Sequence, residues 1–376
     1  MADTLTALAT QATERLAQLG APDTKSEDWR YVKWKPAAEL ELAASHAITD
    51  TDADIVIVDG ALTSSAIDGM RTSPTAADCE RIATAIASGE RADLASVDAT
   101  FIGIELRGVR ATPLRIVHHL TGGESALRIH ILAAPGAVAD LTIETRHHGL
   151  ARCSSALNVV CEGGAAVRID EMEGGATTPE TIGVHLASKR LEVQRDASLR
   201  LTTALTGGTL VRHTTIGDLL DENAELIVGG ATVTTGTSQA HHLVRLNHRV
   251  GKARSRQNFK TIADDRSLAT FDGIIHVDAG ADETDAMQQS NNLQLSPGAR
   301  IVARPQLDIH TDEVIASHGA TIGQPDPEEQ RYLRTRGLDA DTARSLIVGG
   351  FIIAGLAGMG SLRERAQAAL LRLLGI

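Results

Sequence analysis

Apolar positions follow helical spacing at the start of the chain and alternate with polar positions through most of its middle. Residues 1–20 are predicted to form a helix, because apolar residues from Leu5 to Leu19 follow helical spacing and Gly20 is expected to end it. An apolar strand is predicted at residues 54–59 and a helix at residues 76–87. From about residue 114 to residue 309, short β-rich segments are separated by glycine, aspartate and asparagine, as in a mainly β domain.

After Gly323 the apolar period becomes helical again. Asp326 is a candidate N-cap, Pro327 suits the first helical position, and acidic residues follow in the first turn. Three helices are predicted, over residues 327–336, 341–357 and 361–374. The change from strands to helices at Gly323 therefore divides the chain. We predict an N-terminal mixed region (1–113), a β core (114–323) and a C-terminal helical domain (324–376).

A short motif recurs within the β-rich stretch: a turn residue, an alanine, and then apolar residues at alternate positions. It begins at Gly136, Gly164, Asp196, Asn223 and Gly298. The first four copies start 28, 32 and 27 residues apart by subtraction. Repeated strand units are typical of a solenoid. The turn residue is expected to take an unusual backbone angle, and the alternating apolar residues to point into a narrow core. A β-sandwich also alternates, but the constant spacing inside the unit favours a parallel β-helix.

Composition supports a regular core and excludes some functions. Aromatic residues make up only 2% of the 376 residues, so Val, Ile, Leu and Ala are expected to fill the core in layers. The formal net charge of −12 argues against a duplex nucleic-acid binder, which needs a basic face. The apolar run at residues 346–360 is short of the roughly 20 residues of a membrane span. With three cysteines and no visible secretory signal, we expect a cytoplasmic protein.

Few residues form a recognisable chemical motif. Histidines occur in doublets at residues 118–119, 147–148 and 241–242, but neighbouring strand residues face opposite sides, so a doublet suits one metal ion poorly. Cys153 and Cys161 would lie on neighbouring strands in one interpretation, as soft ligands, and are buried structural cysteines in the other. No phosphate-binding loop and no nucleophile elbow is present. We therefore predict no catalytic residues and no enzyme activity.

Two further segments are candidates for contacts. The segment at residues 26–36 holds both tryptophans, and we expect it to pin the N-terminal helix to the body rather than bind a ligand. Gly349 and Gly350, inside a predicted apolar helix, would allow another backbone to approach closely. His318 precedes Gly319 where strands give way to helices, and it is a candidate ligand facing a partner.

The stretch from His248 to Gly337 resembles the SufB/SufD family of the SUF iron–sulfur cluster assembly system. The matching segments occur in the family's order, at residues 255–260, 271–277, 284–296, 304–309, 317–323 and 332–338. The segment Trp29-Arg30-Tyr31 also resembles the family's N-terminal signature, but this resemblance is weaker than that of residues 248–337. Within the family, the sequence His-Gly-Ala-Thr at residues 318–321 resembles the SufD branch rather than the SufB branch.

The resemblance implies a right-handed parallel β-helix with helical regions at both ends. It also implies a scaffold subunit that pairs with a SufB-type paralogue through its last strands. The C-terminal helices would dock a SufC-type ABC ATPase. His318 would help to hold iron or a transient cluster at the SufB interface. A flavin in the complex is left open. The implied partner-binding residues are Arg304, Pro305, Gln306, Ser317, His318, Tyr332, Arg336, Gly349 and Gly350.

One position departs from the family's pattern. The family often has a cysteine two residues before this histidine, where this chain has Ala316. His318 would then act with the partner's ligands alone. Two other functions remain open: a SufB-type scaffold that binds the cluster itself, as a homodimer, and a carbohydrate-active β-helix enzyme. The second is disfavoured by the scarcity of aromatic sugar platforms and the lack of an evident carboxylate pair.

Overall fold

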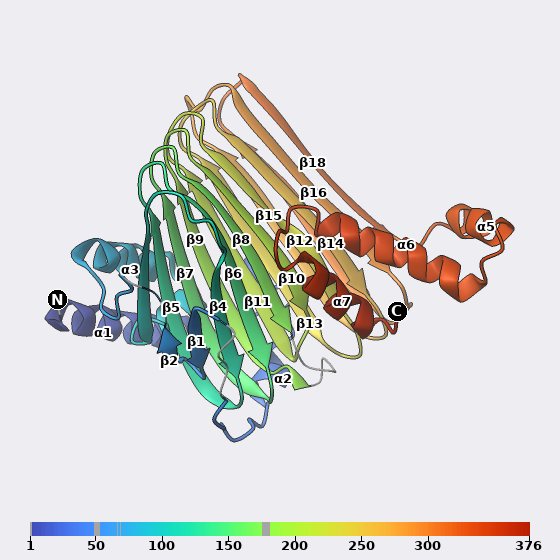
Figure 1. The fold of residues 1–376 in the computed structure, drawn as a ribbon, viewed down its shortest axis with the longest axis horizontal. Coiled ribbons are helices and arrows are strands. Elements are labelled where there is room, and N and C mark those ends of the chain that lie inside the picture. Colours follow the sequence, from blue (N-terminus) through green and yellow to red (C-terminus); the bar gives the residue numbers. More distant parts are fainter. Residues whose placement is uncertain (1, 49–52, 66, 68, 175–180) are drawn as a thin grey trace.

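The computed structural model shows a parallel β-solenoid with helices at both ends (Figure 1). It describes all residues except 1, 49–52, 66, 68 and 175–180. Within the described residues, strands fall into two sheets, one of ten strands and one of eight. We call them sheet A and sheet B. The predicted fold class, a mainly β parallel β-helix with helical ends, is confirmed.

From residue 100 onward the chain alternates between the two sheets, so each turn of the solenoid contributes one strand to each, whereas the first two strands form an antiparallel pair within sheet A. Sheet A contains, in spatial order, β18 (Val314–Gly323), β16 (Thr284–Gln294), β14 (Arg254–Ala263), β12 (Glu225–Thr234), β10 (Ser198–Thr206), β8 (Ala166–Gly174), β6 (Val138–His147), β4 (Leu114–Leu120), β1 (Ile55–Val58) and β2 (Ala61–Ser65). Sheet B contains β17 (Arg300–Ile309), β15 (Leu268–Val277), β13 (Gln239–His248), β11 (Leu210–Leu219), β9 (Val184–Val193), β7 (Ala151–Cys161), β5 (Gly123–Ala133) and β3 (Thr100–Leu106).

The helices lie outside the two sheets. They are α1 (Ala2–Leu19), a 3₁₀ turn at Glu27–Trp29, α2 (Trp34–Ala38), α3 (Ala76–Ser88), α4 (Arg91–Ala95), α5 (Pro327–Thr335), α6 (Ala340–Gly355) and α7 (Arg363–Leu373). Each helix predicted from apolar spacing is present, with ends within three residues of the prediction. Asp326 caps α5 by accepting a hydrogen bond from the Glu328 N–H at 2.8 Å, with Pro327 at the first position.

The recurring motif forms one corner of the solenoid. Its turn residues adopt positive φ: 70° at Gly136, 72° at Gly164, 56° at Asp196 and 58° at Asn223. The alanine that follows each is buried. Gly298 is different, because it precedes a strand of sheet B instead of sheet A and its φ is not among the positive ones. The motif therefore marks the corner that leads into sheet A.

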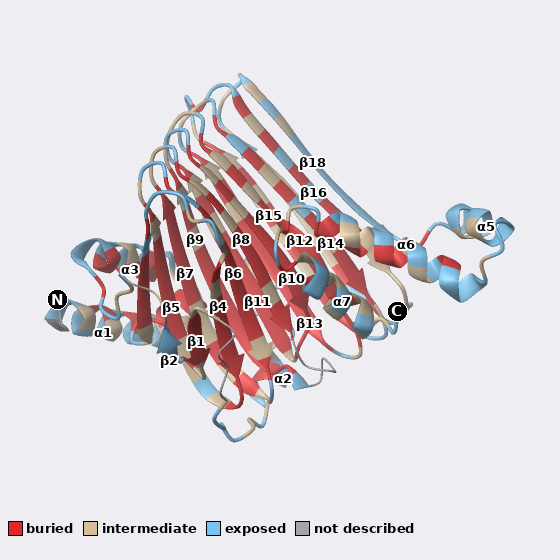
Figure 2. Ribbon diagram, in the orientation of Figure 1, coloured by how far each residue is buried: buried red, intermediate tan, exposed pale blue. Residues whose placement is uncertain are grey.

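The interior between the sheets is built from aliphatic residues in stacked columns, as expected from the low aromatic content. Figure 2 shows the strands buried along most of the solenoid and exposed at β18. Strands β1, β2 and β3 precede residue 114, where we predicted the β core to begin, and β1 and β3 pair in parallel with β4 and β5. The division into domains stays a prediction.

The N-terminal helices cover the outer face of sheet B. Helices α1, α3 and α4 share a small core, and α4 packs against β7 and β9. Trp29, Val32 and Ala37 pack on Val184 and Leu210 of sheet B. As expected, this aromatic segment pins the N-terminus to the body: the Arg212 guanidinium lies 4.4 Å from the Trp29 ring centroid.

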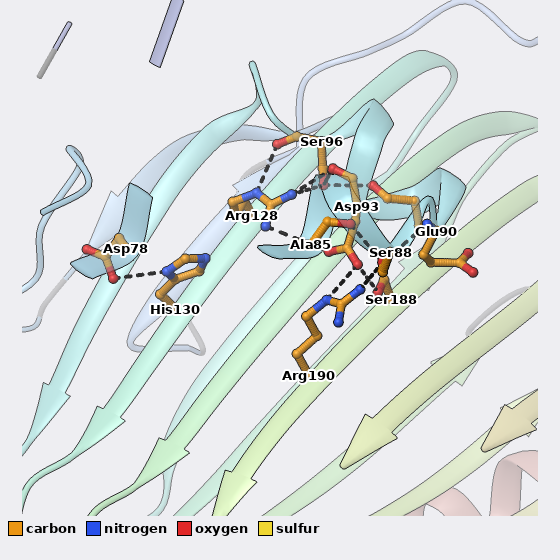
Figure 3. A network of polar contacts seen from close by, with 11 residues as sticks. Asp78, Ala85, Ser88, Glu90, Asp93, Ser96, Arg128, His130, Ser188 and Arg190 are labelled. Atoms are coloured by element: carbon orange, nitrogen blue, oxygen red, sulfur yellow. Dashed lines mark hydrogen bonds and ion pairs between the residues drawn. The ribbon is translucent and has the colours of Figure 1, made fainter. Parts of the chain in front are cut away.

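A buried ion-pair network anchors α4 (Figure 3). Asp93 is 0% exposed and accepts hydrogen bonds from Arg190 Nε at 2.9 Å and Ser188 Oγ at 2.8 Å. Arg128 Nη1 lies 3.8 Å from the same carboxylate, and Arg128 Nη2 donates to the Asp93 backbone carbonyl at 2.7 Å. Burial lowers the pKa of Arg128 to about 10, although Asp93 opposes this effect.

The C-terminal helices cover the outer face of sheet A. Val348 and Ile352 of α6, and Leu356 just after it, pack with residues of α7 on Ala231 and Val233 of β12. Contact is close, since a Cβ on Gly355 would lie 3.0 Å from Ala231 Cβ. In the described part of the chain, no helix is long and apolar enough to cross a bilayer.

Candidate functional site

The solenoid is open at its C-terminal end. Strands β17 and β18 are the edge strands of the two sheets and lie next to each other across the last turn. Most residues of β18 are exposed, in contrast to the buried strands behind it. Unpaired edge strands are templates for a further strand, and solenoids normally need a polar cap at each end. Here α5 leads away from the body instead of covering this end (Figure 1).

Inward-facing residues of the last turn are exposed because no further turn covers them. Ile322 is the register neighbour of Asn292, which is buried, yet Ile322 itself is 49% exposed. Ile315, on the other face of β18, is 74% exposed. Two large apolar side chains are therefore exposed on an uncovered edge strand.

His318 lies on this open face. Its register neighbour is Gln288, which is 2% exposed and donates from Nε2 to Gln257 Oε1 at 2.7 Å inside the solenoid. Register neighbours in parallel strands share a face, so His318 continues the Gln257–Gln288 column to the open end. Ala316 lies one inward-facing position away. His318 and Ser317 are both exposed.

The other predicted contact residues on β17 are held within the chain. The Arg304 guanidinium pairs with Asp272, lies 3.2 Å from Glu27 Oε1 and lies 5.6 Å from the Tyr31 ring centroid. Gln306 Nε2 donates to Asp272 Oδ1 at 3.1 Å. Pro305 is half-buried on the same strand. Arg304 thus joins the N-terminal segment to the edge strand.

The remaining predicted contact residues lie on α5 and α6. Helix α5 packs on α6 and has no buried residue. Tyr332 is 58% exposed, and the Arg336 guanidinium lies 5.2 Å from its ring centroid. On α6, Gly349 is buried near Leu371, whereas a Cβ on Gly350 would meet no atom within 4 Å. Together with the exposed Leu346, these residues form what we call the α5–α6 arm, residues 327–350.

A cluster of charged and imidazole side chains lies inside the solenoid, whose interior is otherwise largely aliphatic. The interior His–Glu cluster consists of His147, Glu171, Glu173, His185, Lys189 and His213. Glu173 Oε1 lies 2.9 Å from both His147 Nε2 and His185 Nδ1, and Glu173 Oε2 lies 2.7 Å from His213 Nε2. The residues come from both sheets, on β6, β8, β9 and β11.

Hydrogen bonds within and around the interior His–Glu cluster fix the orientation of its side chains. Lys189 Nζ donates to His213 Nδ1 at 2.7 Å and pairs with Glu171, which also accepts from Thr203 Oγ1 at 2.8 Å. Ser155 Oγ lies 2.7 Å from His185 Nε2. Burial would lower the pKa of His185, but the Glu173 carboxylate and the neighbouring Cys153 together outweigh burial and hold that pKa well above its usual value.

A second group of possible metal ligands lies at the surface near the open end. His276 Nδ1 lies 2.7 Å from Asp308 Oδ2, and His310 Nε2 lies 3.0 Å from Asp308 Oδ1. His276 Nε2 is also paired, with Asp278 Oδ1 at 2.7 Å. We call this group the surface cluster (His276, Asp308 and His310). His310 and Asp308 are exposed, and such acidic groups often occur without a metal ion.

Comparison with protein families identifies the chain. The model described as "SUF system FeS cluster assembly, SufBD core domain" matches residues 118–351, more than half of the chain. The chain belongs to the SufBD family. It is 28% identical over 374 residues to the iron–sulfur cluster assembly protein SufD of Escherichia coli, which covers 91% of this chain and 86% of that protein.

Other relatives carry the same family description. The iron–sulfur cluster assembly protein SufD of Bacillus subtilis is 32% identical over 145 residues, 36% of this chain and 33% of that protein. A SufBD family protein of Synechocystis is 35% identical over 169 residues, 44% of this chain and 37% of that protein. The predicted recognition of a SufD-like SufBD family member is confirmed.

One interpretation of the sequence needs correction in this SufBD family member. Cys153 and Cys161 lie at opposite ends of one strand, β7, rather than on neighbouring strands, so they cannot share one ion. Burial raises the pKa of Cys161 to about 12, so its thiol stays protonated. The histidines of the interior His–Glu cluster are His147, which is one member of a doublet, and the single histidines His185 and His213. The spacing of 28 residues between His185 and His213, by subtraction, equals the first motif interval, and this periodicity was a signal for stacking.

Proposed function

We propose that this SufD-like protein is a non-catalytic scaffold subunit of a SUF complex. In this proposal it pairs with a SufB-type paralogue and docks a SufC-type ABC ATPase to support cluster assembly. The open last turn of the solenoid carries the proposal, because it presents two parallel edge strands and an exposed inward face. A paralogue with the same solenoid can add its own last strands to β17 and β18, which covers that face.

The α5–α6 arm is the proposed ATPase dock. It extends from the sheets in Figure 1 and exposes two apolar residues, Tyr332 and Leu346. The chain that follows the arm, in the rest of α6 and in α7, packs on sheet A. A force applied to the arm would therefore reach β12 and β14, which contact α6. Motion of the ATPase could in this way be transmitted to the solenoid and its open end.

Exchanging Tyr332 and Leu346 together for alanine should weaken capture of a SufC-type ATPase at least about tenfold, since exposed aromatic anchors dominate many interfaces. The variant should still bind the SufB-type partner, because both side chains lie away from the solenoid. Co-expression and pull-down with each partner measures this. Val109→Ala is the matched control, as Val109 is 78% exposed elsewhere on the protein. Unchanged ATPase capture by the double variant would place the dock elsewhere.

We further propose that His318 is an iron or cluster ligand at the SufB-type interface. A neutral imidazole is a suitable iron ligand. The inward-facing position next to His318 on β18 is Ala316, so that position supplies no thiol ligand. The three cysteines of this chain are buried in α3 and β7, away from β18. Sulfur ligands at the interface would thus come from the partner, with iron or a transient cluster as the cargo.

The variant His318→Ala is expected to lower the iron content of the purified complex at least about tenfold. The fold should be unaffected, because the side chain is exposed. Iron and acid-labile sulfide per complex are the measurements, with His46→Ala as the control, because His46 is an exposed histidine outside both candidate metal clusters. Iron and sulfide equal to those of the unmodified complex would remove His318 from the ligand set. A chain that alone dimerises and carries iron and sulfide would favour the SufB-type alternative.

A further inference from the structure

In the interior His–Glu cluster, Lys189 balances only one of the two glutamate carboxylates, so the cluster needs one more positive charge. Glu171 and Glu173 bring two negative charges and Lys189 one positive charge, so with neutral histidines the sum is −2 + 1 = −1. Lys189 is engaged by Glu171 and by His213 Nδ1. Glu173 faces only imidazole nitrogens among its hydrogen-bond partners within the described chain. A buried carboxylate needs a cation, which is either a proton on a histidine or a metal ion.

The donor set and its geometry suit a metal ion. Ligand atoms of His147, Glu173 and His185 all lie within 4.8 Å of one another, and all three side chains are buried. Tetrahedral ligands at about 2.0–2.1 Å from an ion are about 3.4 Å apart, so the present 2.9 Å contacts need to open by only a few tenths of an ångström. Two imidazoles and one carboxylate form a set that binds Zn²⁺ or Fe²⁺.

Outer hydrogen bonds support two of the three ligands, His185 and Glu173, whereas the second ring nitrogen of His147, Nδ1, has no hydrogen-bond partner among the described residues. Ser155 Oγ contacts the second nitrogen of His185, and His213 Nε2 holds the other oxygen of Glu173. Because Lys189 donates to His213 Nδ1, His213 must be neutral there and donate from Nε2. A neighbouring cavity of about 30 Å³, lined by Ser155, Glu171, His185 and Lys189 among others, is large enough for one water molecule beside His185.

We propose that His147, Glu173 and His185 form a buried site for one divalent transition-metal ion, Zn²⁺ or Fe²⁺, inside the solenoid of a single chain. The site is separate from the His318 face, which lies on the last strand of sheet A, five sheet positions beyond β8. It does not depend on any partner. The ion replaces the protons that otherwise lie between the carboxylate and the two imidazoles, and these protons pass to solvent when the ion binds.

The test is metal content and spectroscopy of the full-length chain. Since the ligands are buried, the ion is supplied during expression, with Co²⁺ as the spectroscopic probe and Zn²⁺ or Fe²⁺ in parallel cultures. His310→Ala serves as the background, because it removes a ligand of the surface cluster and leaves the interior unchanged. In this background we expect one Co²⁺ per chain, with the visible absorption of a tetrahedral nitrogen and oxygen site.

Adding Glu173→Gln to that background should lower the bound metal at least about tenfold while circular dichroism shows an intact fold. If that variant does not fold, the cobalt spectrum of the His310→Ala chain still shows whether the interior cluster binds a metal ion. A His310→Ala chain that retains no metal would show that the cluster holds protons only and would overturn the proposal. Unchanged metal content after Glu173→Gln would also overturn it.

Discussion

Replacing Asp93 by alanine is expected to lower the free energy that holds the N-terminal helices on sheet B by about 3–5 kcal/mol. The carboxylate is fully buried and is the counter-ion of both Arg128 and Arg190. Arg128 has a side-chain exposure of 1%, so removal of Asp93 leaves a guanidinium in the interior with only neutral acceptors. An uncompensated buried charge costs far more than the pair contributes when intact.

Native-state hydrogen exchange of α1, α3 and α4 measures this change directly. The matched control is Glu39→Ala, which breaks the exposed Lys35–Glu39 pair at 3.7 Å and should cost about 0–1 kcal/mol. A loss below about 1 kcal/mol for Asp93→Ala would mean that apolar packing of α4, rather than the ion pair, anchors the N-terminal region.

The variant Gly230→Ala is expected to destabilise the solenoid by at least about 3 kcal/mol. Gly230 lies inside β12 with φ of 155°, and a Cβ there would lie 1.9 Å from the Thr203 carbonyl oxygen and 2.9 Å from the Thr203 nitrogen. The obstacle is the backbone of β10, which is paired on both sides by β8 and β12. It cannot yield as a flexible side chain would.

Thermal and denaturant unfolding of the isolated chain measures this second change. Gly350→Ala is the matched control, because a Cβ there meets no atom within 4 Å and alanine favours the α6 helix by up to about 1 kcal/mol. The two variants should therefore shift stability in opposite directions. Equal stability of Gly230→Ala and the unmodified chain would mean that β10 and β12 are less tightly joined than their register indicates.

The solenoid could be predicted because its signal is local. Each of the four copies that lead into sheet A places a residue with positive φ beside a buried alanine, and these demands recur within a few residues of sequence. The same holds for α5, where Asp326 and Pro327 define the helix start. Local propensity and the tertiary structure agree at these positions, so the short sequence pattern is sufficient to predict the corners and the helix start.

The interior cluster could not be predicted in the same way, because it depends on register between turns. Glu173 meets His147, His185 and His213 only after strands of both sheets are stacked and aligned. A doublet such as His147 and His148 appeared unsuitable when each strand was considered alone. Arg304, read as a partner contact, is engaged with Glu27 from a distant part of the sequence. Contacts between remote segments leave little local signal.

The central claim is that the open last turn is a pairing surface for a SufB-type paralogue. Size-exclusion chromatography with light scattering on the mixed proteins tests it most directly, using Ile322→Lys at the open end and Val109→Lys as the exposed apolar control. The account predicts a stable hetero-complex for the unmodified chain and for Val109→Lys, and none for Ile322→Lys, because a lysine there would place a charge in the covered face. A complex that forms equally well with Ile322→Lys, or no complex with the unmodified chain, would contradict it.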